Sequence, residues 1–125
     1  MLLGKSILGL SSLVFIAYGL ISLFSPAIPS GAAGLEMTNG DAFAEIGAMY
    51  GGLQTGIGVF CLLALLKPDF YRAGLLLLAV AIGTLAVARL ISLMVTDDVV
   101  SIYSYGALAY EFATALIAAA GLKLK

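Results

Sequence analysis

The chain has 125 residues, of which 62% are hydrophobic and only 10% are charged. A soluble domain carries about 25% charged residues, so this composition excludes an ordinary water-soluble fold and indicates a membrane protein. The net charge of −1, without a basic patch, argues against a nucleic-acid partner. Histidine is absent and Cys61 is the single cysteine, so we expect no His-based catalysis, no disulfide within the chain, no metal and no cofactor.

Four long apolar runs predict an all-α protein, a bundle of four transmembrane helices that forms one domain over residues 1–125. Each run is long enough to cross ~30 Å of hydrocarbon. The expected helices cover residues 3–24, 42–66, 70–95 and 102–122. The first run resembles a secretory signal, but its apolar part is longer than a usual signal core, and we therefore expect a membrane helix there.

Turn-forming residues mark the connections between these helices. Pro26, Pro29 and Gly31 are expected to break the chain after the first helix, within the longest connection. Asn39, followed by Gly40 and Asp41, is typical of a turn that leads into a helix N-cap. The sequence Lys-Pro-Asp at residues 67–69 predicts a tight hairpin between the second and third helices.

The flanking charges predict the orientation of the chain in the membrane. In a four-span arrangement the basic residues at or beyond the ends of the spans all fall on one side, and the other side carries only acidic residues. The basic set is Lys5, Lys67, Arg72, Lys123 and Lys125, and the acidic set is Glu36, Asp41, Asp97 and Asp98. Basic flanks stay in the cytoplasm. We therefore expect cytoplasmic N- and C-termini, with the loops at residues 25–41 and 96–101 outside.

The second expected helix is unusual because it holds a carboxylate, an amide and five glycines within a run otherwise suited to lipid. The glycines are Gly47, Gly51, Gly52, Gly56 and Gly58. At about 100° per residue they divide between two nearly opposite stripes, one shared with Glu45 and the other with Gln54. Small residues let neighbouring helices approach closely. We therefore predict that this is the central helix and that these glycines pack against helices on both sides.

Besides Lys5 and Arg72, which lie at the expected cytoplasmic ends, three charged residues lie inside the expected spans. Arg89 and Glu111 are each roughly 12–13 Å below the outer ends of adjacent antiparallel helices, at a rise of 1.5 Å per residue. A lone arginine at mid-helix costs about 2.5–3.5 kcal/mol, so an Arg89–Glu111 ion pair is expected. Glu45 lies higher, only about 6 Å below Asp41.

These charges leave three readings open. In the first, Arg89 holds the bundle together through the carboxylates. In the second, Glu45, Arg89 and Glu111 form a polar pocket in the outer half of the bundle, where one carboxylate keeps a proton or binds a cation. In the third, Glu45 is shallow enough to be hydrated and Arg89 extends toward the surface. The candidate ligand or ion-pair cluster comprises Glu45, Tyr50, Gln54, Arg89 and Glu111.

The pattern of the second helix resembles a bacterial membrane-protein family known as domain of unknown function 4345. The resemblance rests on Glu45 followed by Tyr-Gly-Gly at residues 50–52 and further glycines, on Ala-Arg-Leu-Ile-Ser at residues 88–92, and on Glu111. The family's usual acid-x-Arg appears here as Glu-Ile-Gly, which lacks the basic charge. The resemblance, which extends to DoxX-like proteins, implies a four-helix fold in the bacterial inner (plasma) membrane and supplies no activity.

Three hypotheses for the function remain. The first is an accessory or interaction subunit in contact with membrane lipid, assembled as a homo-oligomer or within a larger membrane complex. The alternative is a carrier or binding protein for a proton, a cation or a small lipophilic ligand, acting through the polar cluster. A third is an intramembrane enzyme that uses Glu111 or Glu45 as an acid–base group. Because no nucleophile–base set is recognisable, we expect the protein not to be an enzyme.

Overall fold

The computed structural model describes residues 1–124; Lys125, counted above among the basic flanks, lies outside that range. The described residues form helices and connections without strands, and four continuous helical stretches are long and apolar enough to cross a membrane. These stretches are Leu2–Phe24, Gly40–Leu66, Pro68–Val95 and Ile102–Lys123. The prediction of an all-α protein with four membrane spans is therefore confirmed, and every span begins and ends within about two residues of its expected bounds.

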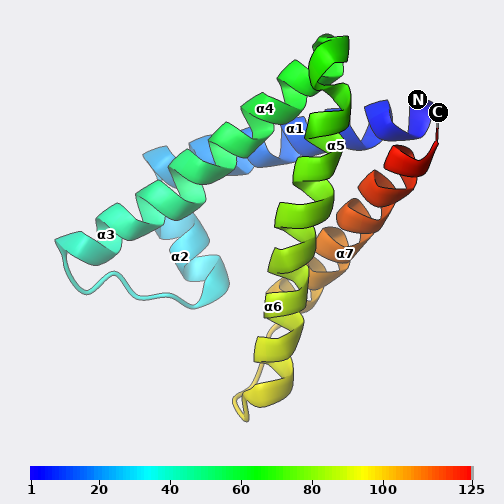
Figure 1. The fold of residues 1–125 in the computed structure, drawn as a ribbon. Helices are drawn as coiled ribbons and strands as arrows, with labels where there is room; N and C mark the ends of the chain where they lie inside the picture. The colour runs from blue at the N-terminus through cyan, green and yellow to red at the C-terminus, as the bar shows by residue number, and fades with distance from the viewer. Residues whose placement is uncertain (125) are drawn as a thin grey trace. The chain divides into compact units, whose positions relative to one another are not determined.

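The middle two spans are not uniform α-helices. The second consists of α3 (Gly40–Ile46), the π-helical segment η1 (Gly47–Leu53) and α4 (Gln54–Leu66). The third begins with a short 3-10 turn, η2 (Pro68–Phe70), and continues through α5 (Tyr71–Leu77), the π-helical segment η3 (Leu78–Ile82) and α6 (Gly83–Val95). The first and fourth spans are the single helices α1 (Leu2–Phe24) and α7 (Ile102–Lys123) (Figure 1).

The chain divides into two compact units. We call Gly9–Leu63 the glycine unit; the hairpin unit combines Met1–Leu8 with Ala64–Lys125. In the glycine unit, α1 packs closely against the second span at three glycines. A Cβ placed on Gly51 would lie 2.9 Å from the Cα of Leu23, and one on Gly58 would lie 2.7 Å from the backbone nitrogen of Ile16. On α1 itself, a Cβ on Gly19 would overlap Thr55. Glycine therefore permits backbone-to-backbone contact between these helices.

The connection at residues 25–41 contains a short helix, α2 (Ala27–Ala33), where the sequence led us to expect a break. Pro29 is the third residue of this helix, and the first backbone N–H groups of a helix have no partner within it. The missing N–H of proline therefore costs nothing there. After α2 the chain turns at Gly34, whose φ of 72° lies in the left-handed region that favours glycine.

The hairpin unit is built on α7, which packs along α5, η3 and α6 (Figure 1). Its core consists of fully buried apolar side chains from these elements, namely Leu75, Leu78, Ile82, Ala86 and Ala118. At one end of the unit, the Arg72 side chain donates to the carbonyl of Leu122 at 3.1 Å, and a Cβ on Gly121 would lie 3.3 Å from the Cα of Gly4. The beginning of α1 and the end of α7 thus meet at the start of α5.

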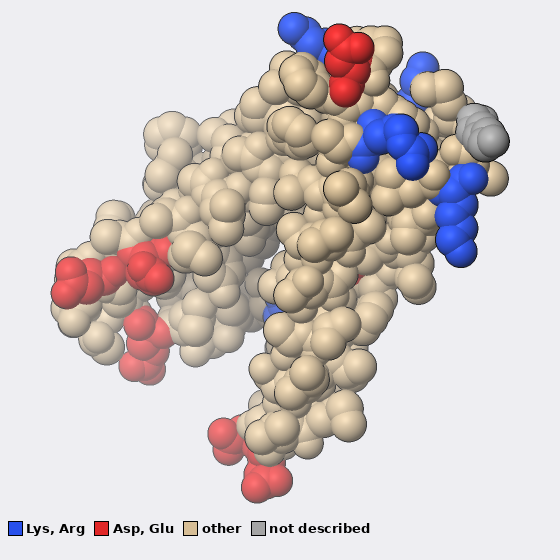
Figure 2. Space-filling model, in the orientation of Figure 1, with Lys and Arg blue, Asp and Glu red and all other residues tan. Residues whose placement is uncertain are grey.

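The two units carry different charges (Figure 2). In the hairpin unit the described basic residues other than Arg89, namely Lys5, Lys67, Arg72 and Lys123, lie in or next to the ends that meet at α5, accompanied by Asp69. Asp97 and Asp98 occupy the α6–α7 connection, at the opposite end of those helices. The glycine unit contains no Lys or Arg among residues 9–63, and its charges are the three carboxylates of Glu36, Asp41 and Glu45.

Candidate functional site

Arg89 and Glu111 form an ion pair across the α6–α7 hairpin. The Nε of Arg89 donates to Oε1 of Glu111 at 2.8 Å, and a terminal guanidinium nitrogen donates to Oε2 at 2.9 Å. The arginine side chain is 25% exposed and the glutamate side chain 8%. Two parallel charge-assisted hydrogen bonds fix the relative position of the two groups more strictly than a single contact does. The ion pair expected from equal depth on adjacent helices is present.

The surroundings of Glu111 show why the pair lies inside the hairpin unit. Glu111 shares a face of α7 with the buried residues Thr114, Ala115 and Ala118. These small side chains leave room for α6 and η3 to approach α7. The guanidinium therefore reaches a carboxylate already directed inward, and the pair holds α6 and α7 together with no net charge.

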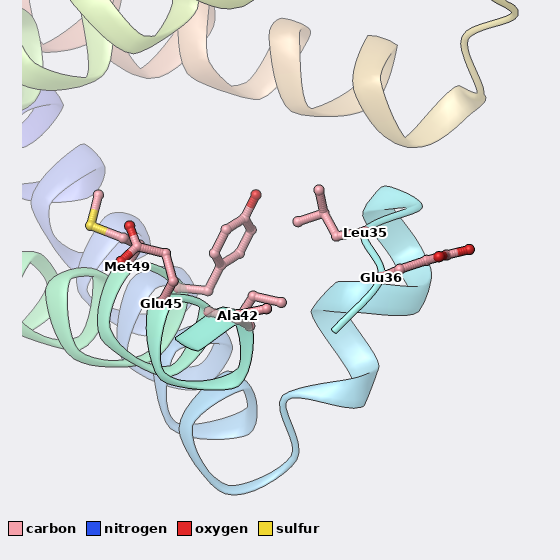
Figure 3. Close-up of a pocket in the computed structure, with 7 residues that line it drawn as sticks. Leu35, Glu36, Ala42, Glu45 and Met49 are labelled. Carbon is pink, nitrogen blue, oxygen red and sulfur yellow. The ribbon is translucent and has the colours of Figure 1, made fainter. Parts of the chain in front are cut away.

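Glu45 belongs to the glycine unit and has a different environment. It is exposed on α3, and no hydrogen-bond or ion-pair donor within residues 1–124 contacts its carboxylate. It lines a pocket of about 400 Å³ with Leu35, Glu36, Ala42, Ile46, Met49 and Tyr50. Figure 3 shows Leu35 directed toward the helix that carries Glu45 and Met49, whereas the side chain of Glu36 points away from them.

The remaining members of the predicted cluster have separate places. Tyr50 also lines the pocket, and its ring packs edge-on against that of Tyr18 on α1, with ring centroids 6.5 Å apart. Gln54 is half-buried at the start of α4 and is not among the pocket residues. Of the residues that line the pocket, the candidate cluster included Glu45 and Tyr50 but not Leu35, Glu36, Ala42, Ile46 or Met49. Their common environment depends on the turn after α2, which no sequence signal links to α3. A role for the five residues as one ligand cluster stays a prediction.

The five glycines do not all pack within the chain. Gly51 and Gly58 are buried against α1. A Cβ built on Gly47, Gly52 or Gly56 would meet no atom of another helix within 4 Å among residues 9–63. Packing of these glycines against another chain stays a prediction.

The described residues also lack a cluster suited to a metal ion. Across residues 1–124, no three His, Cys, Asp or Glu side chains gather as a metal site requires. The charged groups described above are thus one ion pair in the hairpin unit and one carboxylate at an apolar pocket in the glycine unit.

Comparison with known proteins adds one finding. The model of a family described as Domain of unknown function (DUF4345) matches residues 3–122, nearly the whole chain. The chain belongs to this family. The DUF4345 match covers all four spans, the Arg89–Glu111 pair and the Glu45 pocket, and this member is a small helical membrane protein with four spans. No curated protein and no solved structure matches the chain.

Proposed function

We propose that this protein is an interaction subunit of a membrane assembly, and that it docks a further transmembrane helix on Gly52 and Gly56. One observation carries the proposal: these glycines, four residues apart, contact no other helix of residues 9–63. Gly51 and Gly58 serve the packing of α1, whereas Gly52 and Gly56 serve no packing inside their unit.

The physical argument concerns what glycine costs and what it permits. Glycine inside a helix is destabilising by roughly 0.5–1 kcal/mol relative to alanine, so two such residues on a bare face need a compensating contact. In lipid, association of helices relies on close van der Waals packing, and two small residues separated by three positions form the motif that allows it. The docked helix comes from a second copy of this chain or from another chain of a larger complex.

The alternative, a carrier that works through Glu45, Arg89 and Glu111 together, has less support. Arg89 and Glu111 already neutralise each other through two hydrogen bonds, so this pair offers little charge to a proton or a cation. We propose no catalytic role for the protein.

Native mass spectrometry of gently extracted protein tests the interaction proposal. The test variant is Gly52→Leu/Gly56→Leu, because a Cβ meets open space at Gly56 and only the Gly47 carbonyl, at 3.9 Å, at Gly52. The matched control is Gly106→Leu on α7, an equally open helix glycine without a second glycine four residues away. We expect wild type and control to carry the same associated mass, a multiple of 12.8 kDa for a homo-oligomer or a defined second chain otherwise, and the double variant to lose it. An unchanged complex in the double variant would refute the proposed face.

We further propose that the protein lies in the bacterial inner membrane with both termini in the cytoplasm and the loops at residues 25–41 and 96–101 outside. Support comes from the basic residues at one end of the hairpin unit and the acidic α6–α7 connection at the other. In a Cys61→Ala background, single cysteines at Val99 and at Asp69 would be exposed to a membrane-impermeant maleimide on spheroplasts. We expect labelling at position 99 and none at position 69; the reverse result would invert the orientation.

A further inference from the structure

The pocket beside Glu45 combines an apolar wall with a single available charge. Leu35, Ala42, Ile46 and Met49 supply apolar surface, and Tyr50 adds an aromatic ring. Of the two carboxylates that line it, that of Glu36 points away from the labelled residues of α3 and η1 (Figure 3). The volume of about 400 Å³ falls within the range of small-molecule sites. The pocket therefore suits a compact molecule with a large apolar surface.

Local structure fixes both walls of this pocket. On one side, the turn after α2 is closed by backbone hydrogen bonds from Gly34 to Gly31 at 3.4 Å and from Leu35 to Ser30 at 2.8 Å, the pattern of a Schellman motif. The Ser30 hydroxyl also donates to the carbonyl of Leu35. On the other side, the Asn39 side chain caps α3 by accepting from the backbone N–H of Ala42 at 2.9 Å. Hydrogen bonds within the chain therefore hold both walls of the pocket in place.

The helix wall includes a second unusual feature, the π-helical segment η1. Met49 and Tyr50 belong to η1, and Tyr50 is held against Tyr18 of α1. Single π-helical turns within α-helices occur frequently at functional sites, because the widened turn redirects side chains. Here the widened turn directly follows the helical turn that carries Glu45, and residues from both line the same pocket.

The charge at the pocket is negative and uncompensated within its unit. Residues 9–63 contain three carboxylates and no Lys or Arg. Glu45 follows the start of the second span by five residues, which places it roughly 8 Å along the helix from that end. A carboxylate at such a depth, next to apolar side chains, favours a positively charged partner. Anionic ligands are disfavoured by the same charges, and a phosphate group finds no basic side chain in the unit to hold it.

We propose that this pocket binds a small lipophilic cation, an amine or quaternary onium compound, whose apolar groups contact Leu35 and Met49 and whose charge pairs with Glu45. The site does not involve Gly52 or Gly56. Binding of a cation and docking of a helix are therefore separate properties, and either proposal can fail without the other.

Binding of tritiated tetraphenylphosphonium to the protein in nanodiscs of zwitterionic lipid, with empty nanodiscs subtracted, tests the proposal. Tetraphenylborate, which has nearly the same shape and the opposite charge, is the matched ligand. We expect saturable binding of the cation, no saturable binding of the anion, and a loss of affinity of about tenfold or more in Glu45→Gln. Equal affinity in Glu45→Gln and wild type, or saturable binding of the anion, would overturn the proposal.

Two further variants separate the pocket from general negative charge. Asp41→Asn removes a carboxylate of the same unit that does not line the pocket, and we expect affinity within about twofold of wild type. Ala42→Phe fills the pocket while leaving Glu45 in place, and we expect it to abolish saturable binding. Loss of binding in Asp41→Asn equal to that in Glu45→Gln, or unchanged binding in Ala42→Phe, would show that no pocket is involved. Size-exclusion profiles identical to wild type verify that each variant is folded.

Discussion

Arg89 of α6 and Glu111 of α7 face each other so that two guanidinium nitrogens meet the two carboxylate oxygens, at 2.8 and 2.9 Å. Within an apolar helix pair, each charge is tolerated because of the other. The relationship therefore predicts unequal costs for removing one partner and for removing both.

We expect Glu111→Ala to lower the free energy of unfolding by about 2–4 kcal/mol, because it leaves the arginine charge without its carboxylate inside a membrane span. Replacement of both residues, Arg89→Leu/Glu111→Leu, is expected to cost much less than the sum of the two single leucine substitutions. SDS-titration unfolding of the purified protein in mixed micelles measures all variants. Additive losses would mean that the pair contributes no mutual stabilisation.

Gly58 and Gly56 provide a matched comparison within one helix. Gly58→Ala places a Cβ 2.7 Å from the backbone nitrogen of Ile16 and should destabilise the glycine unit by about 1–3 kcal/mol through overpacking. Gly56→Ala meets open space and should be neutral or stabilising by up to about 1 kcal/mol through helix propensity. The same unfolding titration compares the variants. If both substitutions changed the free energy of unfolding in the same direction, the close approach of α1 at Gly58 would be contradicted.

The contact between Gly74 and Ala64 predicts that one substitution can rescue another. A Cβ on Gly74 would overlap the Cβ of Ala64 and lie 3.0 Å from the side chain of Leu8. In the same unfolding titration, Gly74→Ala alone should lower the free energy of unfolding by about 1–3 kcal/mol, and Ala64→Gly alone by about 1 kcal/mol. In the double variant the Cβ of residue 64 is gone. The free energy of unfolding should therefore fall by less than in Gly74→Ala alone. A double variant at least as unstable as the sum of both singles would contradict this packing.

The cap of the second span predicts a local effect. Asn39→Ala removes the side-chain acceptor for the N–H of Ala42 and should cost about 1 kcal/mol, whereas Asn39→Asp should retain the cap. Hydrogen exchange followed by mass spectrometry should show faster exchange in residues 40–46 for the alanine variant, with unchanged exchange in α7. Uniform acceleration in both segments would instead indicate global destabilisation.

The four spans could be predicted from the sequence because the length of an apolar run is a direct measure of what crosses lipid. The Arg89–Glu111 pair followed from equal distances to a shared loop, and Asn39 from the preference of caps for short polar side chains. These features depend on local sequence or on counting residues along a helix, which a single chain reveals.

Other features depend on hydrogen-bond patterns or tertiary contacts without a sequence signature. Nothing in the sequence Gly-Ala-Met-Tyr-Gly-Gly-Leu indicates the i→i+5 bonds of the π-helical segment η1. The pocket was missed because Leu35 reaches it through the turn at Gly34, and α2 was missed because a proline in a first turn was interpreted as a break.

The hairpin unit combines two segments that are far apart in the sequence, and this has a consequence for biosynthesis. Gly4 packs against Gly121, yet Gly4 is synthesised long before Gly121, whereas the glycine unit is one uninterrupted stretch of chain. During translation the glycine unit is able to assemble first. The first turns of α1 then lack their partner in the membrane until α7 has been inserted. The contact between Gly4 and Gly121 is therefore among the last to form.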